Sequence, residues 1–283
     1  MKVIWVLENI QEDENFYGKF NILVLLASVT LWRKYHPTHN CVLYCDDMTK
    51  GVLERMKVLH LWNEVSNYTH SRPINRSVFW ACNKVAVLSE QTEPVILMDN
   101  DTLVFRSFED LLKDEVLVAN LEDGQGYYPG NLDPYVKKLS YRARWKPESL
   151  NVSFLYFPKA DLIKEYTSLS LQMMEEFTAA GTPHSQYLIF AEQLLLRHLL
   201  DKHNIPFKSI ISTYWDCSKW AWGEDHDKGI WPWPESERHF RHYGPLKSMI
   251  INNKTDMSYD DEIKLLLNCI NIPNLDVSFI PNK

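Results

Sequence analysis

The first 45 residues alternate between apolar strands and an amphipathic helix, and this order restricts the fold more than any other feature of the chain. Val3 to Leu7 is a short apolar run of the kind that forms a buried strand, and Cys41 to Cys45 is a second one. A helical pattern lies between them and stops at His36-Pro37, because proline cannot continue a helix. The apolar face of that helix consists of Ile22, Leu25, Leu26, Val29 and Trp32. This order predicts a parallel βαβ unit with a right-handed crossover.

Further along the chain, Val95 to Met98 is a continuous apolar run of strand length between Pro94 and Asp99. A strand without polar alternation is covered on both faces, as in a sheet that lies between layers of helices. We therefore predict an α/β fold with a central, mostly parallel sheet flanked by helices. The sequence shows no internal repeat and no low-complexity linker, so we expect a single domain. The remaining predictions are helices over 52–61, 78–88 and 187–200, strands over 116–119 and 154–157, and a loop over 122–134.

The composition excludes several classes of protein. Hydrophobic residues make up 45% of the chain, which is enough for a sizeable core and argues against disorder. The formal net charge of −7, without a basic stripe, argues against nucleic-acid binding. The first residues lack the apolar core of a signal peptide, and no apolar run is long enough to cross a bilayer. Five cysteines without metal-finger spacing fit a reducing compartment, so we expect a cytoplasmic protein.

Two acids follow the apolar run directly, in Asp99-Asn100-Asp101. Residues i and i+2 of an extended chain point to the same side, so both carboxylates converge where the strand ends. Ligands of open α/β sheets bind at that edge, and two hard oxygen donors there suit Mn²⁺ or Mg²⁺ bound to a diphosphate. The alternative is that these acids only cap a turn, as acids after strands often do.

The stretch VILMDNDTLVFRSFEDLL resembles the metal-binding region of GT-A fold glycosyltransferases, and is most similar to the retaining galactosyltransferase and glycogenin type. Three later segments resemble motifs of the same family in the same order. They are Leu150–Phe154 (F-N-x-G), Ala191–Leu195 (D-Q-D-x-L, at a helix start) and His242–Lys247 (H-x-x-G-x-x-K). Ser153 replaces the glycine of the first motif, and Leu194 replaces the second acid of the next. The last motif is one residue short, which leaves His239 as an alternative to His242.

The resemblance implies a single GT-A (Rossmann-like) domain, with a nucleotide-binding half over 1–105 and an acceptor-side half over 106–283. It implies a metal-dependent glycosyltransferase that moves a sugar from a nucleotide-sugar, UDP-linked in most such families, to a glycan or another hydroxyl acceptor. The cofactor would be Mn²⁺ or Mg²⁺, and the implied metal ligands are Asp99, Asp101 and His242.

Six residues are assigned to donor binding: Glu8, Asn9, Lys84, Asn100, Asn151 and Lys247. Glu8 and Asn9 follow the first strand, where a base or ribose commonly lies, although an ordinary polar loop has the same composition. The lysines are candidates for the diphosphate, and Lys247 is the stronger one because Gly244 lets the backbone approach a phosphate closely. Lys84 has the alternative of being a solvated surface lysine. Asn151 is implied to contact the donor sugar or the acceptor.

The catalytic candidates are Glu192, Gln193 and Asp123. A carboxylate is needed as base for an inverting reaction, and a polar group that stabilises an oxocarbenium-like state is needed for a retaining one. Glu192 has the alternative of being an acid at a helix N-terminus, where the macrodipole favours it. Asp46 and Asp47 close the second predicted strand and either reach the nucleotide or cap the next helix.

Two other functions compete with sugar transfer. A nucleotidyltransferase would need a glycine-rich, basic N-terminal loop, and Glu8 to Glu14 is acidic and has no glycine. A carbohydrate-binding module without turnover would use the tryptophan-rich segment 215–234, whose aromatic faces can pack against sugars. That segment equally suits a loop with a small core of its own.

Overall fold

The computed structural model of the chain describes residues 1–8, 16–68, 71–123, 137, 139–141, 148–181, 186–212, 215–216, 239–244, 247, 250 and 259–272. The chain divides into two compact units. Unit 1 comprises Met1–Tyr68, Met98–Asp110 and Glu224–Lys283, and unit 2 comprises Thr69–Leu97 and Leu111–Gly223.

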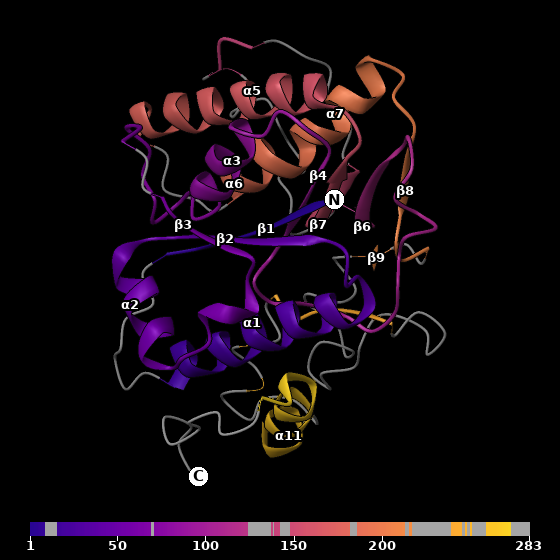
Figure 1. Cartoon of the computed structure of the whole chain (residues 1–283). Coiled ribbons are helices and arrows are strands. Elements are labelled where there is room, and N and C mark those ends of the chain that lie inside the picture. The colour runs from indigo at the N-terminus through magenta and orange to yellow at the C-terminus, as the bar shows by residue number, and fades with distance from the viewer. Residues whose placement is uncertain are drawn as a thin grey trace. The chain divides into compact units, whose positions relative to one another are not determined.

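Unit 1 begins with the predicted strand–helix–strand order. The elements are β1 (Lys2–Leu7), α1 (Phe16–Tyr35), β2 (Asn40–Cys45), α2 (Asp47–Arg55), a 3₁₀ turn (Leu59–Leu61) and β3 (Glu64–Asn67). Strand β2 pairs in parallel with both β1 and β3, which is a Rossmann-like arrangement. The indole of Trp5 on β1 donates a hydrogen bond of 3.1 Å to the hydroxyl of Ser28 on α1. Helix α1 lies between these strands and α11 (Tyr259–Ile270) (Figure 1).

The helix ends follow from local chemistry. Helix α1 ends just before His36-Pro37, as predicted. Asp46 caps α2, because its carboxylate accepts a bond of 2.8 Å from the backbone N–H of Thr49. Capping is thus the role that the structure gives Asp46, while Asp47 accepts a bond of 2.6 Å from the side chain of Asn67. The single helix predicted over 52–61 is wrong: α2 ends at Arg55, and Lys57 with a φ of 58° separates it from the 3₁₀ turn.

A second, two-stranded sheet in unit 1 was not expected. Strand β5 (Thr102–Val104) pairs antiparallel with β10 (Phe240–His242), so that His242 lies opposite Thr102. The two strands are far apart in the sequence, and β10 is only three residues long. This pairing brings a late segment of the chain to the residues that follow β4 (Val95–Met98), which is buried along its whole length as its apolar run predicts.

Unit 2 is built on β6 (Val116–Asp123), which pairs antiparallel with β7 (Ser149–Phe157) and parallel with β8 (Phe207–Ser209) and β9 (Trp215–Asp216). Its helices are α3 (Cys82–Ser89), α5 (Ala160–Ala179), α6 (Gln186–Ile189), a π-helical turn (Phe190–Leu194) and α7 (Leu195–Lys202). The π-helical turn packs against β7, and α3 packs against α5 (Figure 1). Strand β6 continues through Glu122 and Asp123, where a loop had been predicted.

The prediction of an α/β protein with mainly parallel strands and flanking helices is therefore confirmed. The expectation of a single domain stays a prediction. Among the described helices, none is both long enough and apolar enough to cross a membrane.

Candidate metal centre

Asp99, Asp101 and His242 converge in unit 1. One ligand atom from each residue lies within 4.8 Å of the others, and we call these three residues the carboxylate–imidazole cluster. The two acids come from the turn between β4 and β5, in which the backbone N–H of Thr102 donates to the carbonyl of Asp99 at 3.2 Å. His242 reaches them because β10 pairs with β5. The convergence depends on two strands whose pairing the sequence did not predict.

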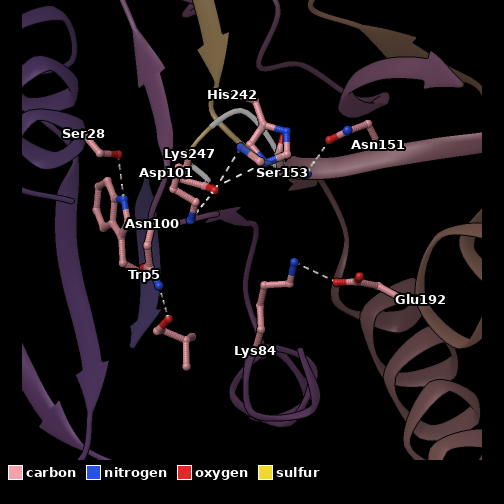
Figure 2. Close-up of polar contacts among 12 residues, drawn as sticks. Trp5, Ser28, Lys84, Asn100, Asp101, Asn151, Ser153, Glu192, His242 and Lys247 are labelled. Carbon is pink, nitrogen blue, oxygen red and sulfur yellow. Dashed lines mark hydrogen bonds and ion pairs between the residues drawn. The ribbon is translucent and has the colours of Figure 1, made fainter. Parts of the chain in front are cut away.

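Asp101 is the most constrained member of the cluster and is 8% exposed. One carboxylate oxygen lies 2.8 Å from the ammonium of Lys247 and accepts a bond of 3.1 Å from the backbone N–H of Gly244. The other oxygen lies 3.4 Å from Nε2 of His242 (Figure 2). The backbone N–H of Tyr243 also donates to the carbonyl of Asp101, at 3.0 Å. The chain after β10 thus fixes both the backbone and the side chain of Asp101.

The charges of the cluster reinforce one another. Burial alone would raise the pKa of Asp101, but Lys247 and His242 outweigh it and hold this pKa well below its usual range. Burial alone would lower the pKa of His242, but the carboxylates of Asp101 and Asp99 outweigh it and raise this pKa. Asp101 is therefore an ionised carboxylate at neutral pH, which is the form that a cation needs.

Gly244 lies directly against the imidazole of His242. A Cβ atom at this position would stand 3.2 Å from Cε1 and 3.4 Å from Nε2 of the ring. Gly244 also has a φ of +37°, in the left-handed region that favours glycine. Both facts explain why this residue is a glycine. Its own backbone N–H is the group that donates to Asp101.

His239, the alternative third ligand, has a different environment. Its ring packs edge-on against Phe108, with 5.8 Å between ring centroids, and its carbonyl accepts a bond of 2.8 Å from Phe105. His242, and not His239, is the histidine that lies with the two acids.

The donor set fits a divalent cation. Carboxylate oxygens suit Mg²⁺ and Mn²⁺, and an imidazole nitrogen suits first-row transition metals. Three protein ligands leave coordination positions for water or phosphate oxygens.

Two other donor-binding candidates of unit 1, Asn100 and Glu8, lie at the end of β1. Asn100 lies between the two acids, and its side-chain amide donates to the carbonyl of Val6 at 2.8 Å (Figure 2). This bond joins the turn between β4 and β5 to β1. Its amide oxygen is buried and has no hydrogen-bond partner among the described residues. Glu8 is half-buried, and Asn9 lies outside the described residues.

Unit 2 pairs two of the remaining candidates, Lys84 and Glu192, with each other. The ammonium of Lys84 on α3 lies 2.8 Å from a carboxylate oxygen of Glu192, and their side chains are 14% and 6% exposed (Figure 2). Lys84 is thus not the solvated surface lysine of the alternative reading. Ser149 on β7 donates to the side-chain carbonyl of Gln193 at 3.1 Å. Glu192 and Gln193 both belong to the π-helical turn, a local distortion that is frequent at functional sites.

The helical segment begins at Gln186, one residue before the start predicted at 187, so Glu192 lies inside it. Glu192 is therefore not an acid at a helix N-terminus. The side chain of Asp123 and most of the tryptophan-rich segment lie outside the described residues, apart from the backbone of β9.

Sequence reasoning missed Glu122. Its carboxylate accepts a bond of 2.5 Å from the amide of Asn151, whose carbonyl oxygen in turn accepts from the backbone N–H of Ser153 at 2.9 Å. Glu122 is 6% exposed. The signal for it is the alternation of the polar residues Asn120 and Glu122 along one face of β6. The apolar run alone predicts a strand that ends at Ala119.

The structure thus defines an α/β protein with a carboxylate–imidazole cluster at the end of a buried strand. A family model described as a family of unknown function, DUF6734, matches residues 2–228, and the chain belongs to that family. No curated protein matches the chain. Among solved structures, the chain is similar to the galactosyltransferase LgtC, crystallised with donor and acceptor sugar analogues, at a TM-score of 0.39 and 11% identity, over 68% of this chain and 70% of that one.

Proposed function

We propose that this chain is a metal-dependent glycosyltransferase that moves a sugar from a nucleotide-sugar, UDP-linked, to a glycan or another hydroxyl acceptor. The observation that carries the proposal is the convergence of Asp99, Asp101 and His242. The ammonium of Lys247 also lies on the carboxylate of Asp101. The ordered resemblance of four sequence segments to GT-A glycosyltransferases supports it independently.

In this proposal the cluster holds Mn²⁺, or Mg²⁺ in its place, and the ion supplies Lewis-acid neutralisation of the leaving diphosphate. The chain contributes the carboxylates of Asp99 and Asp101 and the imidazole of His242 as ligands. Lys247 adds a second positive charge at the same place, and its ammonium stabilises the β-phosphate of the product. Asn100 holds the turn that carries both acids against the end of β1, where Glu8 and Asn9 are the candidates for the base or ribose.

The proposed sugar-side groups belong to unit 2. The ammonium of Lys84 lies on the carboxylate of Glu192, and we assign this pair to charge stabilisation rather than to proton transfer. Gln193 and Asn151 are proposed to orient the transferred sugar, and Asp123 remains a candidate for contact with the acceptor.

The proposal is tested by incubating the chain with a panel of nucleotide-sugars, with Mn²⁺ and with a chelator. We expect release of one nucleoside diphosphate with Mn²⁺ only. Asp99→Asn and Asp101→Asn should abolish release, and Asp110→Asn, which changes an exposed acid of the same unit, should not. Sugar binding without turnover that survives Asp101→Asn would instead identify a carbohydrate-binding module and refute the proposal.

A further inference from the structure

His242 stands between two residues that are both anchored to one carboxylate of α11. Side chains alternate along a strand, so His242 faces Asp101 while Arg241 and Tyr243 face the other way. On that side lies Glu262, in the first turn of α11. We call Arg241, Tyr243 and Glu262 the Glu262 clamp.

The clamp is tightly bonded and largely buried. Nη1 of Arg241 lies 2.9 Å and 3.2 Å from the two carboxylate oxygens of Glu262. The hydroxyl of Tyr243 donates to the nearer of these oxygens at 2.7 Å. Tyr243 is fully buried and Glu262 is 8% exposed. Charge-assisted bonds of this kind fix geometry as well as adding energy.

Ring packing also holds α11 in place. The ring of Tyr243 already packs against Phe20 of α1 at 5.7 Å, and Phe20 packs against Tyr259 of α11 at 6.1 Å. Replacing a buried ion pair by apolar residues of similar volume is often neutral or stabilising, so we infer that this clamp specifies position rather than stability. The position that this clamp specifies is the backbone on either side of His242.

That backbone is directly joined to the metal ligands. Tyr243 and Gly244 donate their N–H groups to the carbonyl and carboxylate of Asp101, and Gly244 lies against the imidazole of His242. A shift of Tyr243 by a fraction of an ångström would move both contacts. Groups one step removed from a metal commonly orient its ligands in this way.

We propose that Glu262 is a positioning residue for the metal centre, which acts through Arg241 and Tyr243 on His242 and Asp101. The inference rests on the proposed function, because it assumes that the carboxylate–imidazole cluster binds a cation. His242 and all three residues of the clamp lie beyond the 2–228 segment that the family model matches. The third ligand and the residue that positions it therefore both come from the C-terminal part of the chain.

The test is Mn²⁺ binding by the full chain without nucleotide, measured by the loss of the free-ion electron paramagnetic resonance signal. In Glu262→Gln one of the two acceptor oxygens becomes an NH₂ group and the charge opposite Arg241 is lost. We expect the affinity for Mn²⁺ to fall about tenfold. The fall should be smaller in Tyr243→Phe, which removes the 2.7 Å bond to Glu262 and the 3.4 Å bond from Arg241 but keeps the contact between Arg241 and Glu262.

The matched control is Asp261→Asn, which removes the same charge from the neighbouring residue of α11. Its side chain is 74% exposed, so it should bind Mn²⁺ as the unchanged chain does. Wild-type affinity in a folded Glu262→Gln chain would overturn the inference, because a clamp that only stabilises α11 would lower the melting temperature alone. If Glu262→Gln does not fold, the affinity of Tyr243→Phe decides. If the unchanged chain binds no Mn²⁺, the proposed function fails as well.

Discussion

At the scale of single residues, Gly244 gives the sharpest test of how the cluster is built. In Gly244→Ala the new methyl group would stand 3.2 Å from the ring of His242, and the ring would have to move. We expect Mn²⁺ affinity to fall about tenfold, since displacing a ligand has effects of this size. We also expect a loss of about 1 kcal/mol in the free energy of unfolding, from the left-handed backbone. Isothermal titration and urea unfolding measure the two quantities.

Gly181→Ala separates the two effects. Gly181 also has a left-handed backbone, with a φ of +67°, but a Cβ there would meet nothing within 4 Å. It should therefore lose similar stability and keep its affinity for Mn²⁺. Equal affinities in the two variants would mean that the contact between Gly244 and His242 is unimportant for the metal centre.

The residues that the sequence revealed are those whose neighbours in space are also neighbours in the chain. Asp99 and Asp101 were found because they flank one residue at the end of an apolar strand. The partners of Tyr243 and Lys84 were not found, because Glu262 and Glu192 belong to other elements and no spacing links them. Glu122 was missed for a different reason: its strand runs further than its apolar residues suggest.

At the scale of elements, the pair formed by Lys84 and Glu192 joins α3 to the π-helical turn. Both side chains are nearly buried, so removing Lys84 takes a compensating positive charge away from a carboxylate in the interior. We expect Lys84→Met to lower the free energy of unfolding by about 3 kcal/mol. The double variant Lys84→Met, Glu192→Gln should recover part of that loss, which a double-mutant cycle in urea measures.

An exposed pair with the same separation provides the control. Arg72 and Glu175 also lie 2.8 Å apart, but their side chains are 47% and 32% exposed. Arg72→Met should lower the free energy of unfolding by less than about 1 kcal/mol, because water screens such pairs. A similar cost for both substitutions would show that burial does not set the strength of the Lys84–Glu192 pair.

The C-terminal end of α1 should make the chain sensitive to acid. Burial, and then the neighbouring His39, lower the pKa of His36 from 6.5 to about 4, although Glu109 and the carbonyl of Trp32 oppose this shift. Between these pH values the unfolded chain binds a proton that the folded chain does not. The free energy of unfolding should therefore be at its full value above about pH 6.5 and fall by about 3 kcal/mol as the pH drops to 4.

His36→Gln should reduce this loss of stability at low pH without removing it, because burial also lowers the pKa of His39 to about 4. A glutamine oxygen can still accept the 2.9 Å bond that the backbone N–H of Phe108 donates to His36, but it does not titrate. His60→Gln, at an exposed histidine, should leave the fall in the free energy of unfolding at low pH unchanged. Urea unfolding at several pH values gives the slope of the free energy of unfolding against pH. An unchanged slope in His36→Gln would exclude His36 as the cause.

The elements themselves were predictable where periodicity is strong. Apolar patterns in the sequence predict the order of β1, α1 and β2. A continuous apolar run likewise predicts the buried strand β4. Strands β5 and β10 are too short to show a period, and their pairing depends on distant parts of the chain. The π-helical turn was hidden because its residues fit an ordinary amphipathic helix.

At the scale of the whole molecule, the proposed function predicts that cation and nucleotide stabilise the chain together. A ligand that binds only the folded state adds about 2.7 kcal/mol when its concentration is 100 times its dissociation constant. For a chain of this length, Mn²⁺ should thus raise the melting temperature by about 5 °C. UDP should bind weakly alone, because the carboxylates of Asp99 and Asp101 repel its phosphates until a cation lies between them.

Mn²⁺ and UDP should therefore raise the melting temperature by more than the sum of their separate effects, and differential scanning calorimetry measures this. Asp101→Asn should remove the joint effect and most of the effect of Mn²⁺, whereas Asp110→Asn should remove neither. The positive coupling is expected because each ligand supplies the charge that the other needs, and it must be the same whichever is added first. A shift with UDP that is equal in Mn²⁺ and in chelator would show that the nucleotide binds without the cluster, and the metal-dependent mechanism would then be wrong.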